Sequence, residues 1–62
     1  MRQPGGRFVV GEKAASSLGA AIAYAASLAI NEKRDTYVRV IGEPRAVVRC
    51  EWDGHGVNVI RN

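Results

Sequence analysis

The sequence has few of the residues that form crosslinks or carry catalytic chemistry. Its 62 residues include one cysteine, Cys50, and one histidine, His55, and aromatic residues make up only 6%. A lone cysteine cannot form an internal disulfide, so we expect a reducing, cytoplasmic compartment. Cys50 and His55 fall short of the four ligands that a structural zinc site needs, so we expect no metal and no cofactor.

Charge is also missing from one long stretch of the chain. No charged residue occurs between Ala14 and Ile30. This run reaches the lower limit of about 17 residues for a membrane span. Alanine, serine and glycine make up most of it, however, so its hydropathy is too low and we expect no membrane partner. We expect no signal peptide, because the run begins well after Met1 and follows a strand-like segment.

The uncharged stretch has the periodicity of a helix with one apolar side. At about 100° per residue the core-facing side is small and aliphatic. It consists of Leu18, Ala21, Ile22, Ala25 and Ala29, with Ala14 and Ala15 beside them. Glu12 is expected in the first helical turn, and Lys33 and Arg34 at the other end, where their charges complement the helix dipole.

The opposite side of this helix carries small residues where a surface helix usually carries charge. We call this side the helix ridge, and it consists of Ser16, Ala20, Ala23, Tyr24 and Ser27. Small side chains let a second backbone approach closely, so the ridge predicts a homodimer or larger homo-oligomer. A domain of this length buries only about 60% of its unfolded surface, so association would add stability. The alternative is an exposed helix in which alanine serves only helix propensity.

Strand-like segments with turn residues between them surround the helix. Residues 1–6 contain Pro4, Gly5 and Gly6 and indicate a loose arm, and residues 7–62 form a single domain. An apolar run at residues 8–10 precedes the helix, and the expected later strands are residues 37–41, 45–52 and 57–60. The order β-α-β-β-β predicts an α+β fold, with one long helix packed on a small, mainly antiparallel sheet.

Alternation along the strands assigns side chains to the two faces of the sheet. The predicted helix-facing set is Val38, Val40, Ala46, Val48, Cys50 and Trp52. We expect Trp52 to be the largest part of the core, and the alternative is that it anchors an interface. The other face is predicted to carry Ile41, Val47 and Glu51 together with four candidate partner-binding residues, Tyr37, Arg39, Arg45 and Arg49. We call these four residues and their surroundings the basic sheet face.

The basic sheet face suits more than one kind of partner. Guanidinium groups contact phosphates and an aromatic ring stacks on a base, which favours nucleic acid. Sheet proteins that bind RNA use two or three stacking rings, however, and this face has one. The same face, or an edge strand, would otherwise bind a partner protein, or its arginines would only solvate an open sheet. The formal net charge of +3 is compatible with an anionic partner without requiring one.

The last predicted strand, residues 57–60, has two opposed interpretations. It is short and is followed by Arg61. A strand at a sheet edge is either blunted by such a charge or used for pairing with another chain. The sequence leaves both interpretations open.

The sequence matches known catalytic motifs poorly. Residues 6–13 resemble a phosphate-binding loop, but a strand lies between the glycines and no serine or threonine follows Lys13. Neither Ser16 nor Ser17 has a nucleophile elbow around it. His55 lies beside Asp53 in a glycine-flanked turn, which favours a hairpin tip over a catalytic base or metal ligand. We therefore expect no catalytic residues and no enzymatic activity.

One pattern covers most of the chain. Residues 21–29 read A-I-A-Y-A-A-S-L-A and residues 36–40 read T-Y-V-R-V. Together they resemble the strand–helix–strand pattern of many very small proteins encoded by phages and prophages. The resemblance implies a non-enzymatic accessory role, binding and inhibiting a host protein or binding nucleic acid, and it carries no site residues over. We therefore expect a homo-oligomeric module that binds a partner protein, with nucleic-acid binding as the alternative.

Overall fold

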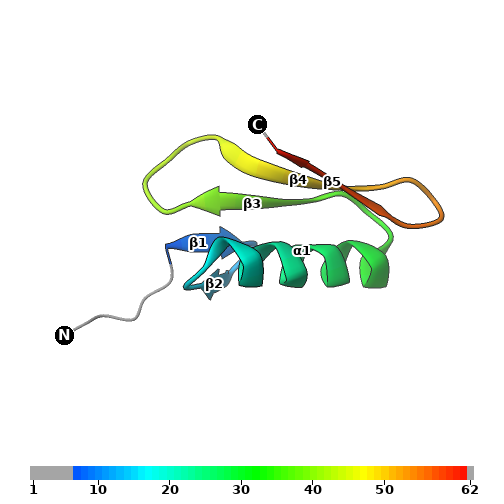
Figure 1. Ribbon diagram of the computed structural model, residues 1–62, viewed down its shortest axis with the longest axis horizontal. Coiled ribbons are helices and arrows are strands. Elements are labelled where there is room, and N and C mark those ends of the chain that lie inside the picture. Colours follow the sequence, from blue (N-terminus) through cyan, green and yellow to red (C-terminus); the bar gives the residue numbers. More distant parts are fainter. Residues whose placement is uncertain (1–6, 62) are drawn as a thin grey trace.

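The structure is a computed structural model that describes residues 7–61, and it contains five strands and one helix (Figure 1). The elements are β1 (Phe8–Val10), β2 (Lys13–Ala15), α1 (Leu18–Glu32), β3 (Thr36–Val40), β4 (Ala46–Trp52) and β5 (Val57–Arg61). The predicted α+β class is confirmed, although the order is β-β-α-β-β-β. The predicted arm at residues 1–6 lies outside the described residues.

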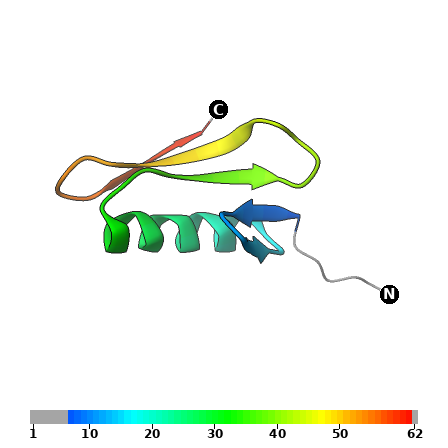
Figure 2. The same cartoon turned by 180° about the vertical axis from the view of Figure 1, so that it is seen from behind.

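The five strands form one sheet in the order β2-β1-β3-β4-β5, and every neighbouring pair is antiparallel. The helix packs against one face of this sheet, as the two opposite views in Figures 1 and 2 show. Within residues 7–61 no helix or strand covers the other face, because α1 is the only element outside the sheet. Strands β2 and β5 are the two edges.

The start of the helix differs from the prediction, because a second strand precedes it. Gly11, with a φ of 61°, and Glu12 form a tight turn, and the chain returns as β2 with Lys13 opposite Val10. Ala14 and Ala15 therefore belong to a strand, and Glu12 is not in a helical turn. The helix begins after Ser17, whose extended backbone and side chain cap it: its Oγ accepts a hydrogen bond from the Ala20 amide at 3.1 Å.

The end of the helix is fixed by a left-handed residue. Lys33 has φ 56° and ψ 48°, and the Ala29 carbonyl accepts hydrogen bonds from the amides of Lys33 and Arg34. This geometry satisfies carbonyls that the last helical turn would leave unpaired. Lys33 and Arg34 lie just beyond the last turn, and the Arg34 guanidinium forms an ion pair with Glu32 at 2.6 Å.

Small side chains make up the core. Ala21, Ala25 and Ala29 are fully buried on one side of α1, where they pack against Val10, Val38, Val48 and Cys50 of the sheet, and the predicted Leu18 and Ile22 are partly buried around them. The Thr36 hydroxyl donates a hydrogen bond of 2.7 Å to the Ala25 carbonyl, which holds β3 against the helix. Burial raises the pKa of the Cys50 thiol.

The prediction that Trp52 is the largest part of the core is wrong. Trp52 is half-buried and lies outside the buried cluster, and the largest fully buried side chains are Val38, Val48 and Cys50. The Trp52 amide donates a hydrogen bond of 3.0 Å to the Asp35 carboxylate, which ties the end of β4 to the start of β3. The close approach of helix and sheet that the alanines permit leaves no space for an indole ring between them.

A β-bulge reverses the predicted faces of two residues in β4. Val38 pairs with Val48 but the next residue, Arg39, pairs with Ala46, so Val47 is an extra residue in β4. Val47 consequently packs against the core, whereas Ala46 lines a hollow on the basic sheet face. Both assignments are the opposite of those that regular alternation predicts.

Candidate interaction face

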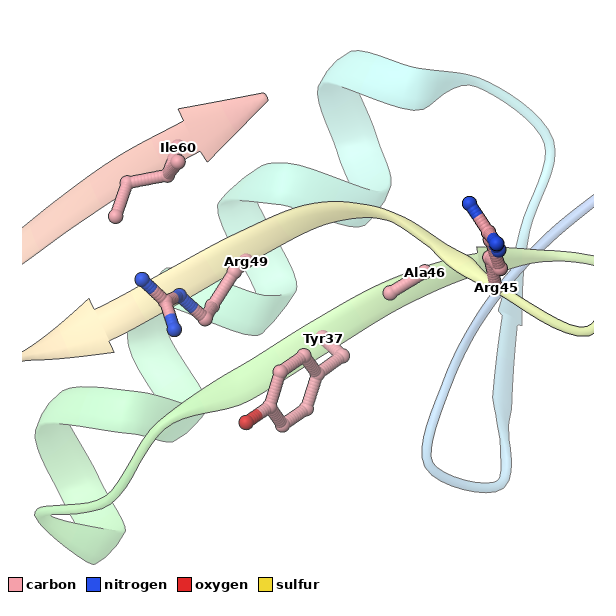
Figure 3. Close-up of a pocket in the computed structure, with 5 residues that line it drawn as sticks. All are labelled: Tyr37, Arg45, Ala46, Arg49 and Ile60. Atoms are coloured by element: carbon pink, nitrogen blue, oxygen red, sulfur yellow. The ribbon is translucent and has the colours of Figure 1, made fainter. Parts of the chain in front are cut away.

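Three neighbouring strands bring a row of side chains together on the uncovered face of the sheet. Tyr37 of β3 pairs with Arg49 of β4, and Arg49 pairs with Ile60 of β5. Alternation explains why these residues face outward, since their neighbours Thr36, Val38, Val48 and Cys50 are buried. Figure 3 shows the Tyr37 ring and the Arg49 guanidinium on the same side of the sheet, with α1 behind it.

The row borders a shallow hollow of about 450 Å³. Its lining consists of Tyr37, Arg45, Ala46, Arg49 and Ile60 (Figure 3). The lining therefore combines two cations with an aromatic ring and two aliphatic side chains. Tyr37 is 46% exposed, so one large apolar surface is accessible beside the arginines.

The arginines of this face differ in how far their charge is compensated. Arg49 forms a half-exposed ion pair with Glu51 at 3.5 Å. Arg39 donates a hydrogen bond of 3.2 Å to the carbonyl of Pro44, a neutral acceptor. Among residues 7–61, neither Arg39 nor Arg45 has a carboxylate partner within salt-bridge distance. These two cations are available to an acidic ligand.

A second, smaller hollow of about 200 Å³ lies beyond the end of β1, beside the part of β3 that β1 does not pair with, and it also touches the helix. Its lining includes Tyr37, Arg39, Arg34 and the aliphatic side chains of Val10 and Leu28. Tyr37 therefore lines both hollows, each of which also contains arginine. The ring is placed to contact a ligand that occupies either hollow.

All four predicted residues of the basic sheet face are brought together in the structure. Tyr37, Arg45 and Arg49 line the larger hollow, and Arg39 and Tyr37 line the smaller one. Sequence reasoning missed Ile60 and Ala46 as lining residues. Ile60 pairs with Arg49, so it could be assigned to this face only once the β4–β5 register was known. Ala46 could not be assigned to it because the bulge in β4 interrupts the alternation.

The predicted helix ridge is exposed on the side of α1 that faces away from the sheet. Ala20, Ala23, Tyr24 and Ser27 lie in the helix and are exposed, whereas Ser16 lies in the segment before it. The Lys13 ammonium lies 5.6 Å from the centroid of the Tyr24 ring, so one cation borders the ridge. Nothing within residues 7–61 covers this surface.

The turn between β4 and β5 is organised by Asp53. Its carboxylate accepts hydrogen bonds from the backbone amides of His55 and Gly56, at 2.8 and 2.9 Å, and from the Asn58 side chain at 3.2 Å. The bonds from Gly56 and His55 lower the pKa of Asp53, so its carboxylate is ionised at neutral pH. Residues 53–56 form the turn between β4 and β5, as the sequence predicts.

The described part of the chain has no cluster of three or more His, Cys, Asp or Glu side chains that could hold a metal ion. No helix among the described residues is sufficiently long and apolar to span a bilayer. Comparisons with protein-family models, with curated proteins and with solved structures find no match to this chain.

Proposed function

We propose that this protein is a small, non-enzymatic, homo-oligomeric interaction module that binds an acidic partner protein through its basic sheet face. The observation that carries the proposal is the grouping of Tyr37 with Arg45 and Arg49 around a hollow on the uncovered sheet face, and with Arg39 around a second hollow beside the helix. The unpaired thiol of Cys50 fits a reducing cytoplasm, where we place the protein. An accessory or inhibitory role of the kind found among small phage proteins is consistent with these features.

The composition of the face favours a protein partner over nucleic acid. Arginine and tyrosine, together with tryptophan, are enriched among the residues that dominate binding energy in protein interfaces. Ile60 and Ala46 add an aliphatic floor beside Tyr37, which suits an apolar side chain better than a phosphate. Glu51 compensates Arg49 and would repel a phosphate backbone at that end of the face. Acidic side chains of a partner would instead contact Arg39 and Arg45.

The triple replacement Arg39→Glu, Arg45→Glu and Arg49→Glu is expected to weaken partner binding by about a hundredfold or more, because it reverses the charge at the contact surface. The measurement is selection from a displayed peptide library, followed by calorimetric titration of the selected peptides. Wild-type protein should enrich peptides that combine Asp or Glu with an apolar residue. Thermal unfolding should show that the variant is folded, since the three arginines are exposed or half-exposed.

A matched control separates a local contact from the effect of total charge. Arg7→Glu, Lys13→Glu and Lys33→Glu change the net charge by the same amount, and none of these residues lines the larger hollow. This control should retain peptide binding. The proposal fails if the control and the triple variant lose binding equally, or if no acidic peptide is enriched.

Nucleic acid is the second candidate ligand, because two arginines of the face have no carboxylate partner among residues 7–61 and Tyr37 is exposed beside them. Phosphate contacts make affinity fall steeply with salt, with a slope of about −0.7 per phosphate on a single strand. Titration of a fluorescent single-stranded oligonucleotide at several salt concentrations distinguishes the candidates. Tight, salt-dependent binding that the triple variant loses would assign the face to nucleic acid.

Self-association through the helix ridge is part of the proposed function. The double replacement Ala20→Glu and Ala23→Glu places two charges on the ridge and should lower the mass measured by light scattering. Both positions are exposed in the single chain, so the variant should remain folded with only a small loss of helix propensity. An unchanged mass would exclude the ridge as an interface. Ser27→Glu tests the ridge at a third position and should also lower the mass.

A further inference from the structure

The two edges of the sheet differ in how well they are protected against pairing with another chain. Strand β2 is a three-residue edge that carries Lys13, and short length and lysine are common means of blunting an edge. Strand β5 pairs with β4 over five residues without a bulge and contains no proline or lysine. Val59 at its centre is 46% exposed although it lies on the helix side, opposite buried Cys50. The β5 edge is therefore open and regular.

The register shows which backbone groups of β5 point outward. The Asp53 amide donates to the Gly56 carbonyl at 3.1 Å, so this pair is of the hydrogen-bonded type. Because the two types of pair alternate along an antiparallel ladder, Asn58 and Ile60 bond to β4. The backbone groups of Val57, Val59 and Arg61 consequently face away from the sheet. Within residues 7–61 no strand pairs with this side of β5.

These outward groups suit antiparallel pairing of β5 with a second copy of itself. When Val59 lies opposite Val59 of the second copy, Val57 of each copy lies opposite Arg61 of the other. Every pair then joins two residues whose backbone groups face outward. A shift of two residues in either direction would leave one outward residue of each copy unpaired. Pairing about Val59 is thus the two-fold register that satisfies the most backbone groups.

The charges of the β4–β5 hairpin favour the same antiparallel arrangement. Arg45 and Arg61 lie at its open end, and Glu51 and ionised Asp53 lie at its turn end. A two-fold axis through Val59 places the open end of one hairpin beside the turn end of the other. The negative turn end of each hairpin then lies nearer the positive open end of its partner, whereas a parallel arrangement would bring ends of like charge together.

We propose that two copies of this chain join edge to edge through β5, in antiparallel register about Val59, so that two five-stranded sheets form one continuous sheet. The basic sheet faces of both copies then lie on the same side, with Ile60 of each near the junction. This interface is distinct from the helix ridge and independent of the proposed partner. Both interfaces together would build an assembly larger than a dimer.

A charge-complementation experiment tests the edge pairing, using the Ala20→Glu, Ala23→Glu chain so that the ridge does not contribute. Light scattering should give this parent chain a mass of twice 6.7 kDa. Val59→Lys and Val59→Glu should each raise the dimer dissociation constant by about tenfold or more at low salt, because like charges then lie opposite each other. An equimolar mixture of the two variants should recover the dimer. The isosteric Val59→Thr should dimerise as the parent does.

Amide hydrogen exchange gives a residue-level test that a dimer formed elsewhere would fail. In the dimer, the amides of Val57, Val59 and Arg61 should gain protection as concentration rises. The amides of Asn58 and Ile60 should be protected at all concentrations by β4. The proposal is overturned if the parent chain is monomeric, if either charged variant dimerises as strongly as the parent, if the mixture stays monomeric, or if the three outward amides exchange freely in the dimer.

Discussion

Replacing Ala25 by leucine is expected to unfold the domain at room temperature. Ala25 is fully buried at the middle of α1, and its own carbonyl is held by the Thr36 hydroxyl at 2.7 Å. The side chain belongs to the same buried cluster as Val38, Val48 and Cys50, which are also fully buried, so additional carbons have no free volume to occupy. Leucine would force the helix away from the sheet and break the Thr36 hydrogen bond.

The expected loss in the free energy of unfolding is about 5 kcal/mol, of which about 3 kcal/mol comes from overpacking and about 2 kcal/mol from the lost Thr36 hydrogen bond. Native domains have only about 5–15 kcal/mol in total, and one of this length lies toward the lower end. Loss of the cooperative thermal transition in far-ultraviolet circular dichroism would record the unfolding. Asn31→Leu is the control, because it places leucine at an exposed position of the same helix outside the helix ridge and should leave the transition within about 0.5 kcal/mol of the wild type. A folded Ala25→Leu variant would contradict the tight helix–sheet contact.

The three later strands could be predicted from the sequence because their local signals agree with the fold. Alternation of valine with tyrosine and arginine marks β3, and two clusters of turn residues separate β3, β4 and β5. The Asp53 carboxylate and the positive φ of Gly54 then form the second turn as a tight hairpin tip. The same alternation placed Tyr37, Arg39 and Arg49 correctly on the uncovered face.

The first hairpin could not be predicted, because β2 has none of the signals of a strand. Lys13–Ala15 contains two alanines, which favour a helix, and it is only three residues long. The uncharged run continues across the boundary between β2 and α1, so neither charge nor hydropathy marks it. Ser17 does mark the helix start, but Ala20 stands where a capping box would have Glu or Gln, which weakened that signal. Pairing with β1 decides the conformation of this segment.

The bulge in β4 was hidden for a different reason. Ala46, Val47 and Val48 are all apolar, so no polar residue among them shows where alternation is interrupted. The interruption appears only in the pairing with β3, where Val47 has no opposite residue. Trp52 was misplaced because size was taken as a guide to burial, whereas the buried side of this helix consists of alanines.

Substituting aspartate along β4 is expected to reveal the bulge as two consecutive intolerant positions. Val48 is fully buried and Val47 packs against the core, so an unpaired carboxylate at either position loses its hydration. We expect a loss of about 3 kcal/mol or more for Val48→Asp and about 2 kcal/mol for Val47→Asp. Both losses are a large share of the stability of so small a domain.

Ala46→Asp and Arg49→Asp should leave the domain folded, because both residues line the open hollow on the basic sheet face. The new carboxylate at position 46 would lie among arginines, which favours its charged form. Urea unfolding of the four variants measures the pattern, and a regular strand would give strict alternation, with Ala46→Asp damaging and Val47→Asp harmless. That alternating result would contradict the bulge and would place Ala46 on the helix side of the sheet. The expected result instead requires that Ala46 and Arg49 share one face although their residue numbers differ by three. In a regular strand an odd difference places two residues on opposite faces, so this result requires an extra residue in the strand.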